Sequence, residues 1–213
     1  MSSAADIRKE YRMKTLLENE VDADPIMQFQ KWWEELMQCD IGEPNAMTLA
    51  TATAAGVPSA RIVLLKEFNQ QGFVFFTNYK SRKGMELMEN SNACLVFFWK
   101  ELERQVRIDG VVEKISAEES EKYFASRPHE SQVGAWASEQ SALLSNRKEL
   151  DEKAALLTLQ YENKIVPRPE WWGGYVVKPH TIEFWQGRPG RMHDRILYSL
   201  EEERGWKIER LSP

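Results

Sequence analysis

The feature that most constrains this fold is a series of short apolar segments, each bounded by turn residues, that begins at Ala46. Short strands separated by turn signals are typical of an antiparallel sheet. With few helices between them, they predict a mainly β fold of the α+β class, built as a closed or partly closed β-barrel with peripheral helices. The expected strands are 46–54, 59–68, 73–78, 93–100, 104–115, 173–178, 181–186, 195–200 and 205–211.

Helix signals precede and interrupt these strands. Asp24 is a favourable N-cap and Pro25 fits the first helical position, and large apolar residues then follow at helical spacing to about residue 39. Ser116 and Glu119 have the spacing of a capping box. We expect helices over 25–39, 81–90, 116–126 and 146–164, with room for a short helix within 131–145.

The chain has 213 residues, enough for one domain around one core. We expect a flexible N-terminal arm over the polar residues 1–23, and a single domain over 24–213. A formal net charge of −5 argues against nucleic acid or an anionic membrane as a partner, and no apolar run is long enough to span a membrane. The two cysteines, far apart in the chain, fit a reducing compartment, so we expect a cytoplasmic protein.

Ser81, Arg82 and Lys83 form a first candidate phosphate site, at the predicted start of a helix. Cations in a first turn oppose the helix dipole by roughly 0.3–1 kcal/mol each, while the free backbone N–H groups there attract anions. A bound phosphate would turn this electrostatic cost into a gain. The alternative is two solvated cations at the start of a tolerant helix.

Tyr123, Arg127 and Ser131 form a second candidate. Tyr123 and Arg127 are four residues apart, one above the other on a predicted helix, and Ser131 lies just past the break at Pro128, where it could cap the next turn. Two hydroxyl groups and a guanidinium could together bind a phosphate. The alternative is an ordinary helix end whose arginine is favoured by the helix dipole.

Arg61 and Lys66 bracket four aliphatic residues in a predicted strand. Their spacing puts them on opposite faces of a regular strand, so either they serve different groups or the strand bends. A core strand with basic ends is the simpler alternative. Gln105, Gln140 and Ser141 are isolated polar residues that matter only as partners of such cations.

The stretch from Glu183 to Tyr198 carries three further basic residues. An aromatic run enters a Gly/Pro turn, and Arg191, His193 and Arg195 leave it. If the exit is extended, the three side chains share one face and repel one another, so an anionic or electron-rich ligand is expected over them. The alternative is a solvated hairpin edge whose basic residues discourage edge pairing.

Several signals are missing from the sequence. There is no dinucleotide-binding fingerprint and no Walker loop. His129, His180 and His193 show no metal-binding spacing, so no metal is expected. Candidate phosphate sites in a chain without a nucleotide-binding motif indicate that the ligands are small phosphorylated molecules, bound by side chains.

Taken together, these motifs resemble the pyridoxine (pyridoxamine) 5'-phosphate oxidase family, in family order from about residue 24 to the C-terminus. The most specific of them is Arg191-Met-His-Asp-Arg195, following Glu183-Phe-Trp-Gln-Gly187. The others are Arg61-Ile-Val-Leu-Leu-Lys66, Phe76-Thr-Asn78, Ser81-Arg-Lys83, Glu103-Arg-Gln-Val106, Tyr123-Phe-Ala-Ser-Arg-Pro128, Ser131-Gln-Val-Gly-Ala135, Gln140-Ser141 and Trp172-Gly-Gly174.

The resemblance implies a split β-barrel that binds FMN, and a homodimer with two active sites in the subunit interface. It implies a flavoprotein oxidoreductase of vitamin B6 metabolism. The reaction would be the oxidation of pyridoxine 5'-phosphate or pyridoxamine 5'-phosphate to pyridoxal 5'-phosphate, with oxygen as final acceptor and release of hydrogen peroxide. The cofactor carries the reactivity, and the protein positions two ring systems and two phosphates.

The resemblance also implies roles by position. The FMN contacts would be Arg61, Lys66, Phe76, Thr77, Arg82, Lys83, Gln105, Gln140, Ser141, Trp185 and Arg195. The substrate contacts would be Arg8, Tyr11, Lys66, Tyr123, Arg127, Ser131, Arg191 and His193. Arg191 and His193 would lie at the substrate ring as the catalytic residues, and residues 8–11 could close over it. Phe76 stands where some family members have Tyr.

Two other functions stay open. One is a split-barrel flavoenzyme with a different substrate, such as a flavin reductase, which would share the FMN contacts but need not carry the substrate contacts. The other is a module that stores or delivers pyridoxal 5'-phosphate without turnover. Formation of peroxide would distinguish the oxidase from such a module.

Overall fold

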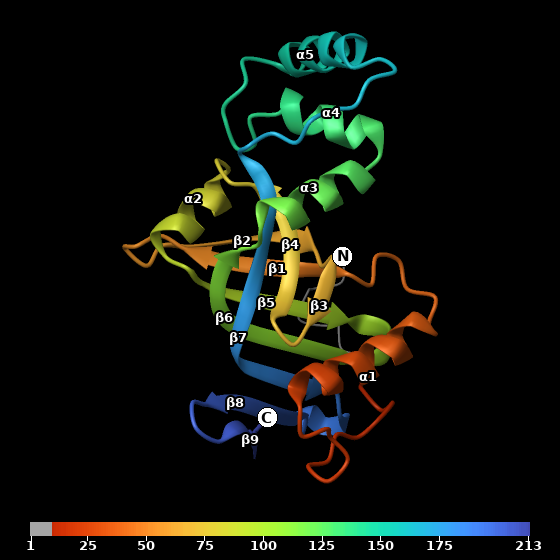
Figure 1. Ribbon diagram of the computed structural model, residues 1–213. Helices are drawn as coiled ribbons and strands as arrows, with labels where there is room; N and C mark the ends of the chain where they lie inside the picture. Colours follow the sequence, from red (N-terminus) through yellow and green to blue (C-terminus); the bar gives the residue numbers. More distant parts are fainter. Residues whose placement is uncertain (1–9) are drawn as a thin grey trace.

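The computed structural model describes residues 10–213, so the predicted substrate contact Arg8 lies outside the described residues. In the described part, the strands are β1 (Ala46–Ala52), β2 (Pro58–Leu64), β3 (Glu67–Asn69), β4 (Gly72–Asn78), β5 (Asn92–Trp99), β6 (Arg104–Lys114), β7 (Trp172–Gln186), β8 (Asp194–Glu201) and β9 (Gly205–Arg210). They form one antiparallel sheet in the order β2-β1-β5-β6-β7-β4-β3, and β8 and β9 continue from β7 (Figure 1).

Strand β7 decides the shape of this sheet. It pairs with β6 along its length, with β4 over its first part and with β8 over its last part. The register with β6 shifts between Asp109 and Gly110, opposite Pro179, and such an irregularity bends a strand and tolerates proline. The predicted strands 173–178 and 181–186 are therefore one bent strand, and the curled antiparallel sheet is the expected split barrel.

Five α-helices surround the described sheet: α1 (Pro25–Met37), α2 (Arg82–Glu89), α3 (Ala117–Ser126), α4 (His129–Ala137) and α5 (Arg147–Gln160). The predicted cap at Asp24 is confirmed, because its side chain accepts a hydrogen bond from the N–H of Ile26. The capping box of Ser116 and Glu119 is also confirmed. No helix among residues 10–213 is long and apolar enough to cross a membrane.

The core lies between α1 and the concave side of the sheet. Phe29 of α1 is fully buried and makes edge-to-face contacts with Phe68, Phe73 and Phe97, with ring centroids 4.8–5.3 Å apart. A second, smaller cluster joins α3 and α4 to the start of β7 through Phe124. Figure 1 shows the consequence: α3, α4 and α5 stand at one end of β7, and α1, β8 and β9 lie at the other.

Residues 10–23 lie against the body at the α1 end. The backbone N–H groups of Arg12 and Met13 donate to the carboxylate of Glu103 at 2.8 and 3.2 Å. The N–H of Leu16, whose side chain is buried, donates to Asp194. The flexibility of residues 1–23 and the domain boundary at residue 24 stay predictions.

Candidate active site

A cavity of about 880 Å³ lies between β2, β4, α2 and the α3–α4 region. It collects ten of the predicted contacts: Arg61, Lys66, Phe76, Thr77, Lys83, Tyr123, Arg127, Ser131, Gln140 and Ser141. We call it the cationic cavity. Arg61 and Lys66 reach it together because β2 ends at Leu64, so that the alternation of a regular strand no longer applies to Lys66.

One side of the cationic cavity is the start of α2. Ser81 is the N-cap, and its side chain accepts a hydrogen bond from the N–H of Gly84. The ammonium of Lys83, 8% exposed, has neutral oxygens as hydrogen-bond partners, on Thr77 and Gln140 at 3.3 Å and on Ser81 at 3.4 Å. Burial and the charge of Arg61 lower the pKa of Lys83, against the opposing charge of Glu86. A buried cation at a helix N-terminus is an anion-binding arrangement.

Arg82 does not line the cationic cavity itself. Its guanidinium is bonded to Glu86 and its side chain lines a neighbouring cavity of about 840 Å³, which shares Gln140 and Ser141 with the cationic cavity. The backbone N–H of Arg82 donates to the hydroxyl of Ser141 at 3.2 Å. The predicted helix-start motif is thus assembled, with Lys83 inside the cationic cavity and Arg82 at its border.

The opposite side of the cationic cavity is aromatic. Phe76 stacks on Tyr123, with ring centroids 3.9 Å apart, and both stack on Trp172. The guanidinium of Arg127 lies 4.5 Å from the Trp172 ring centre, and burial lowers the pKa of Arg127 while Tyr123 opposes that shift. Nη1 of Arg127 is buried and finds no hydrogen-bond partner among the described residues. An unmet charged donor of this kind suits a phosphate oxygen.

Ser131 also lines the cationic cavity, but it does not cap a helix. The N-cap of α4 is Pro128, without a side-chain cap hydrogen bond, so the prediction that Ser131 caps the turn is wrong. Because α4 starts directly after the proline, Ser131 lies inside its first turn, where its N–H donates to the carbonyl of Pro128. Ser131 and Arg127 line the same cavity.

A second group of predicted contacts lies at the other end of β7. Gln105 of β6, Trp185 of β7 and Arg195 of β8 are direct register partners, so their side chains share one face of three neighbouring strands. Nε of Arg195 donates to Glu183 at 2.7 Å, and this bond raises the pKa of Arg195. Glu183 is buried and also lies 3.1 Å from Nη2 of Arg107, so it separates two arginines.

The exit from the Gly/Pro turn is not extended, so the prediction that three basic side chains share one face is wrong. Pro189–Arg191 form a 3-10 turn in which Gly190 and Arg191 both have a φ of +63°, and β8 begins only at Asp194. Left-handed backbone at two successive residues reverses the chain and breaks the alternation. Arg191 stands exposed on this turn.

His193 follows the turn and packs into an aromatic corner. Its ring centroid lies 4.6 Å from Trp185 and 6.0 Å from Tyr11. Nδ1 accepts a hydrogen bond from the N–H of Arg188 at 3.1 Å. Burial and the charge of Arg191 lower the pKa of His193, against the opposing charge of Asp194. A neutral imidazole that carries its proton on Nε2 is therefore favoured.

The predicted contacts thus form two separate groups within one chain. Trp172 lines the cationic cavity, whereas Trp185, thirteen positions later on the same strand, packs against His193. Thirteen residues of strand measure about 40 Å along the chain. Figure 1 shows these two ends of β7 beside different sets of elements. The two groups of predicted contacts therefore lie towards opposite ends of one long strand.

Three residues of the site were missed from the sequence. Glu86 follows Arg82 by four positions on a helix, a spacing that could have identified it. Trp172 was part of a motif, but nothing in the sequence predicted that Arg127 would lie on its ring. The partnership of Glu183 and Arg195 depends on the β7–β8 register, for which the sequence carried no signal.

Family models cover most of the chain. Residues 33–161 match the model described as pyridoxamine 5'-phosphate oxidase. Residues 172–213 match the model described as the pyridoxine 5'-phosphate oxidase C-terminal dimerisation region.

Individual proteins agree with these matches. The chain is 55% identical over 212 residues to a pyridoxine/pyridoxamine 5'-phosphate oxidase of Acaryochloris marina, covering 100% of this chain and 96% of the relative. The crystal structure of PhzG from Burkholderia lata, in complex with tetrahydrophenazine-1-carboxylic acid, is similar with a TM-score of 0.88 and 30% identity, over 94% of this chain and 99% of that one. A pyridoxamine 5'-phosphate oxidase-related, FMN-binding protein from Nostoc punctiforme shares the fold, with a TM-score of 0.70 and 13% identity over 91% and 100% of the two chains.

Proposed function

The chain belongs to the pyridoxine/pyridoxamine 5'-phosphate oxidase family, and we propose that it performs the reaction for which its curated relatives are named. It oxidises pyridoxine 5'-phosphate or pyridoxamine 5'-phosphate to pyridoxal 5'-phosphate and uses FMN. The observation that carries this proposal is that one cavity holds two separate cationic groups, Lys83 at the start of α2 and Arg127 on the ring of Trp172. They suit the two phosphates, one of the cofactor and one of the substrate.

The residues at the start of α2 fit the phosphate of FMN. Lys83 is buried among neutral oxygens, and the first-turn N–H groups of α2 add partial positive charge. We propose that Arg61, Arg82, Lys83 and Ser141 hold this phosphate, and that Lys66, Phe76, Thr77 and Gln140 contact the rest of the cofactor. FMN, when bound, supplies the acceptor for the hydride that leaves the substrate.

The aromatic side of the cationic cavity fits the substrate phosphate. The guanidinium of Arg127 lies over the Trp172 ring, and its Nη1 finds no hydrogen-bond partner among the described residues. Tyr123 and Ser131 add hydroxyl groups to the same wall, and Lys66 adds a second cation. We propose that these four residues bind the phosphate and so fix the substrate ring.

We propose further that the site is completed by a second copy of the chain. The group of Trp185, Arg191, His193 and Arg195 lies about 40 Å along β7 from the cationic cavity, and this separation supports a role for the group in the cavity of a partner. The match of residues 172–213 to a dimerisation region supports this arrangement. So do exposed apolar residues on the same sheet face as Gln105, such as Phe98, which is 54% exposed and is its direct register partner.

In such a homodimer, Arg191 would cover the substrate ring and favour its electron-rich states. His193, held through Nδ1, would orient a ring substituent with its Nε2–H group. Gln105, Trp185 and Arg195 would approach the flavin, and Tyr11 would close the substrate side. Oxygen as final acceptor, with hydrogen peroxide as product, and a cytoplasmic location belong to the same proposal, the latter supported by two cysteines that are free.

Anaerobic titration of the purified protein tests the proposal. We expect a yellow protein whose flavin absorbance bleaches on addition of pyridoxine 5'-phosphate and returns, with one equivalent of peroxide, when air is admitted. Chromatography of the released flavin should give FMN. A protein that bleaches only with another reductant would instead be a different flavoenzyme, and one that binds pyridoxal 5'-phosphate without peroxide would be a carrier.

A further inference from the structure

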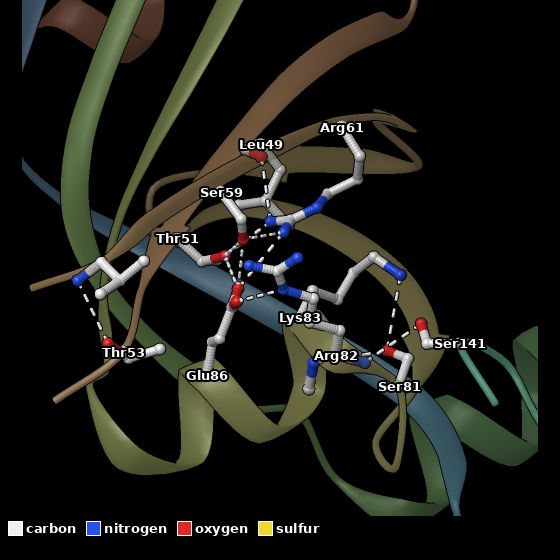
Figure 2. A network of polar contacts seen from close by, with 12 residues as sticks. Leu49, Thr51, Thr53, Ser59, Arg61, Ser81, Arg82, Lys83, Glu86 and Ser141 are labelled. Atoms are coloured by element: carbon white, nitrogen blue, oxygen red, sulfur yellow. Dashed lines mark hydrogen bonds and ion pairs between the residues drawn. The ribbon is translucent and has the colours of Figure 1, made fainter. Parts of the chain in front are cut away.

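Glu86 is a buried carboxylate next to the predicted flavin phosphate site, yet it lines neither of the two neighbouring cavities. It lies on α2, one turn after Arg82, and its side chain is directed at β1 and β2. Figure 2 shows the guanidinium groups of Arg61 and Arg82 converging on it. Glu86 therefore contacts the predicted phosphate ligands without contacting the space that the phosphate would occupy.

Four side chains donate to this carboxylate. Oε1 accepts from Nε of Arg82 at 2.9 Å, and Oε2 accepts from the hydroxyls of Thr51 and Ser59 and from Nη2 of Arg61 at 3.3 Å. Each hydroxyl has one proton, which it gives to Glu86, so its lone pairs are left for Arg61. Thr51 indeed accepts from Nη1 of Arg61 at 2.6 Å, and Ser59 accepts from Nη2. The two hydroxyls thus bridge Arg61 to the carboxylate.

The geometry at Arg82 leaves its two Nη groups available to a ligand. Glu86 is bonded to Nε, and the structure gives the two Nη atoms no hydrogen bond to another described residue. A guanidinium fixed at Nε can still present both Nη groups to an anion. Glu86 can therefore hold this long, largely exposed side chain in place without occupying its phosphate-binding end.

The carboxylate stays ionised. Burial raises its pKa, but the hydrogen bonds from Ser59, Thr51 and Arg82 and the charge of Arg61 outweigh burial, so the pKa of Glu86 is lowered to about 2. Three cations, Arg61, Arg82 and Lys83, face this one carboxylate, and the cluster remains cationic overall. An anionic ligand would still be attracted, while the repulsion between the cations is relieved.

We propose that Glu86 is a positioning residue for the phosphate of FMN: it holds Arg61 and Arg82 in place before the cofactor binds. This inference rests on the proposed function, because it assumes that these arginines meet the flavin phosphate. Without the carboxylate, both arginines would have to be ordered by the ligand itself, at a cost in affinity. The effect should be confined to the phosphate end of the flavin.

The test compares FMN with riboflavin, which lacks the phosphate. Dissociation constants of both for the full-length apoprotein are measured by quenching of flavin fluorescence. For Glu86→Ala we expect the ratio of FMN to riboflavin affinity to fall at least about tenfold, with riboflavin affinity within about twofold of wild type, as for the loss of a charged hydrogen bond. Glu86→Gln keeps an acceptor oxygen for the hydroxyls and should restore part of the ratio.

Glu89→Ala is the matched control, because Glu89 is an exposed glutamate on the same helix. The ratio of FMN to riboflavin affinity should not change in this variant.

Two results would overturn the inference. If Glu86→Gln and Glu86→Ala weaken the binding of FMN and of riboflavin equally, Glu86 has a merely structural role. If these variants bind FMN more tightly, repulsion between Glu86 and the phosphate dominates. If Glu86→Ala does not fold, Glu86→Gln alone decides between these outcomes. A wild-type apoprotein that does not prefer FMN over riboflavin would instead contradict the proposed function.

Discussion

At the scale of single residues, the proposed site contains cations that are buried or partly buried. Lys83 is surrounded by neutral oxygens, and Arg127 lies on the ring of Trp172 with a donor unmet among the described residues. Desolvated charges of this kind interact strongly with an anion, because little water remains to be displaced. Arg195, by contrast, is already paired with Glu183. The basic residues therefore differ in how much of their charge and hydrogen-bonding capacity remains for a ligand.

Substitutions of Arg191 and of Arg195 should have different effects on turnover and on flavin binding. Arg191→Ala should leave a protein that still binds FMN but has a lower kcat/KM. The expected loss of transition-state stabilisation is about 2–4 kcal/mol, because Arg191 is exposed on its turn and faces the substrate in the proposed dimer. Arg191→Lys should rescue little, since the planar fork is lost. Arg195→Ala should lose much of its flavin. Flavin occupancy and kcat/KM of the variants are the measurements. Normal turnover in Arg191→Ala, or flavin loss there and not in Arg195→Ala, would contradict the assignment.

The lowered pKa of His193 predicts a pH effect on stability. A histidine whose pKa is lower in the folded than in the unfolded protein stabilises the fold above the unfolded value of about 6.5, and this contribution is lost as pH falls through the lowered folded value. Wild type should therefore lose more stability than His193→Asn when the pH falls from 7.5 towards 5. Urea unfolding at a series of pH values checks this, and parallel curves for the two proteins would exclude it.

At the scale of elements, β7 joins the two groups of predicted contacts, and the N-terminal segment packs against one of them. The carboxylate of Glu103 accepts two backbone hydrogen bonds from Arg12 and Met13, directly after Tyr11, whose ring meets Trp185 and His193. Glu103 is buried and has a φ of +54°, so the chain adopts a costly backbone conformation where this carboxylate is presented. The segment is thereby placed over the corner that contains His193.

Glu103→Gln should loosen this segment. The amide keeps one acceptor but loses the charge, and charged hydrogen bonds contribute about 1.5–3 kcal/mol, so amide hydrogen exchange in residues 10–16 should accelerate roughly tenfold or more. The KM for substrate should rise while FMN occupancy stays constant. Glu101→Gln, an exposed glutamate two residues earlier, is the control. Unchanged exchange in Glu103→Gln would show that other contacts hold the segment.

At the scale of the whole molecule, the proposed function assigns the two separated groups of predicted contacts to sites that two chains build together. A symmetric dimer would place the cationic cavity of one protomer against the turn of Arg191 and His193 of its partner, and the reverse. Each active site would then contain both halves, one from each chain. Dissociation would leave two incomplete halves rather than two weaker enzymes.

Mixing two impaired variants tests this arrangement directly. Arg127→Ala damages the cationic cavity and Arg191→Ala damages the other half, so a mixed dimer contains one site with both defects and one site with none. Equal amounts, unfolded and refolded together, should recover about a quarter of wild-type activity, because about half of the dimers are mixed and each has one intact site. Arg127→Ala mixed with Arg127→Lys is the control and should recover nothing beyond the two variants alone. Sites contained within one chain would give no recovery in either mixture.

The local features of this protein could be predicted from its sequence. The caps at Asp24 and Ser116 depend on residues within one turn, and the strands depend on short apolar runs between turns. Lys83 and Arg127 were also identified as candidates because their motifs are contiguous; both line one cavity, and their binding of phosphate stays a prediction. These features need no information about which distant segments meet.

Only the tertiary structure decided how these pieces are combined. The register of β6, β7 and β8 aligns Gln105, Trp185 and Arg195, and the length of β7 keeps them away from the cationic cavity. The left-handed turn at Gly190 and Arg191 ended the alternation that a strand would have given. Strand register and backbone reversal are set by packing between residues far apart in the chain. The periodicity of the sequence carries no information about this packing. For the same reason, the bridge from Glu86 through Thr51 and Ser59 to Arg61 became visible only when α2 was placed against β1 and β2.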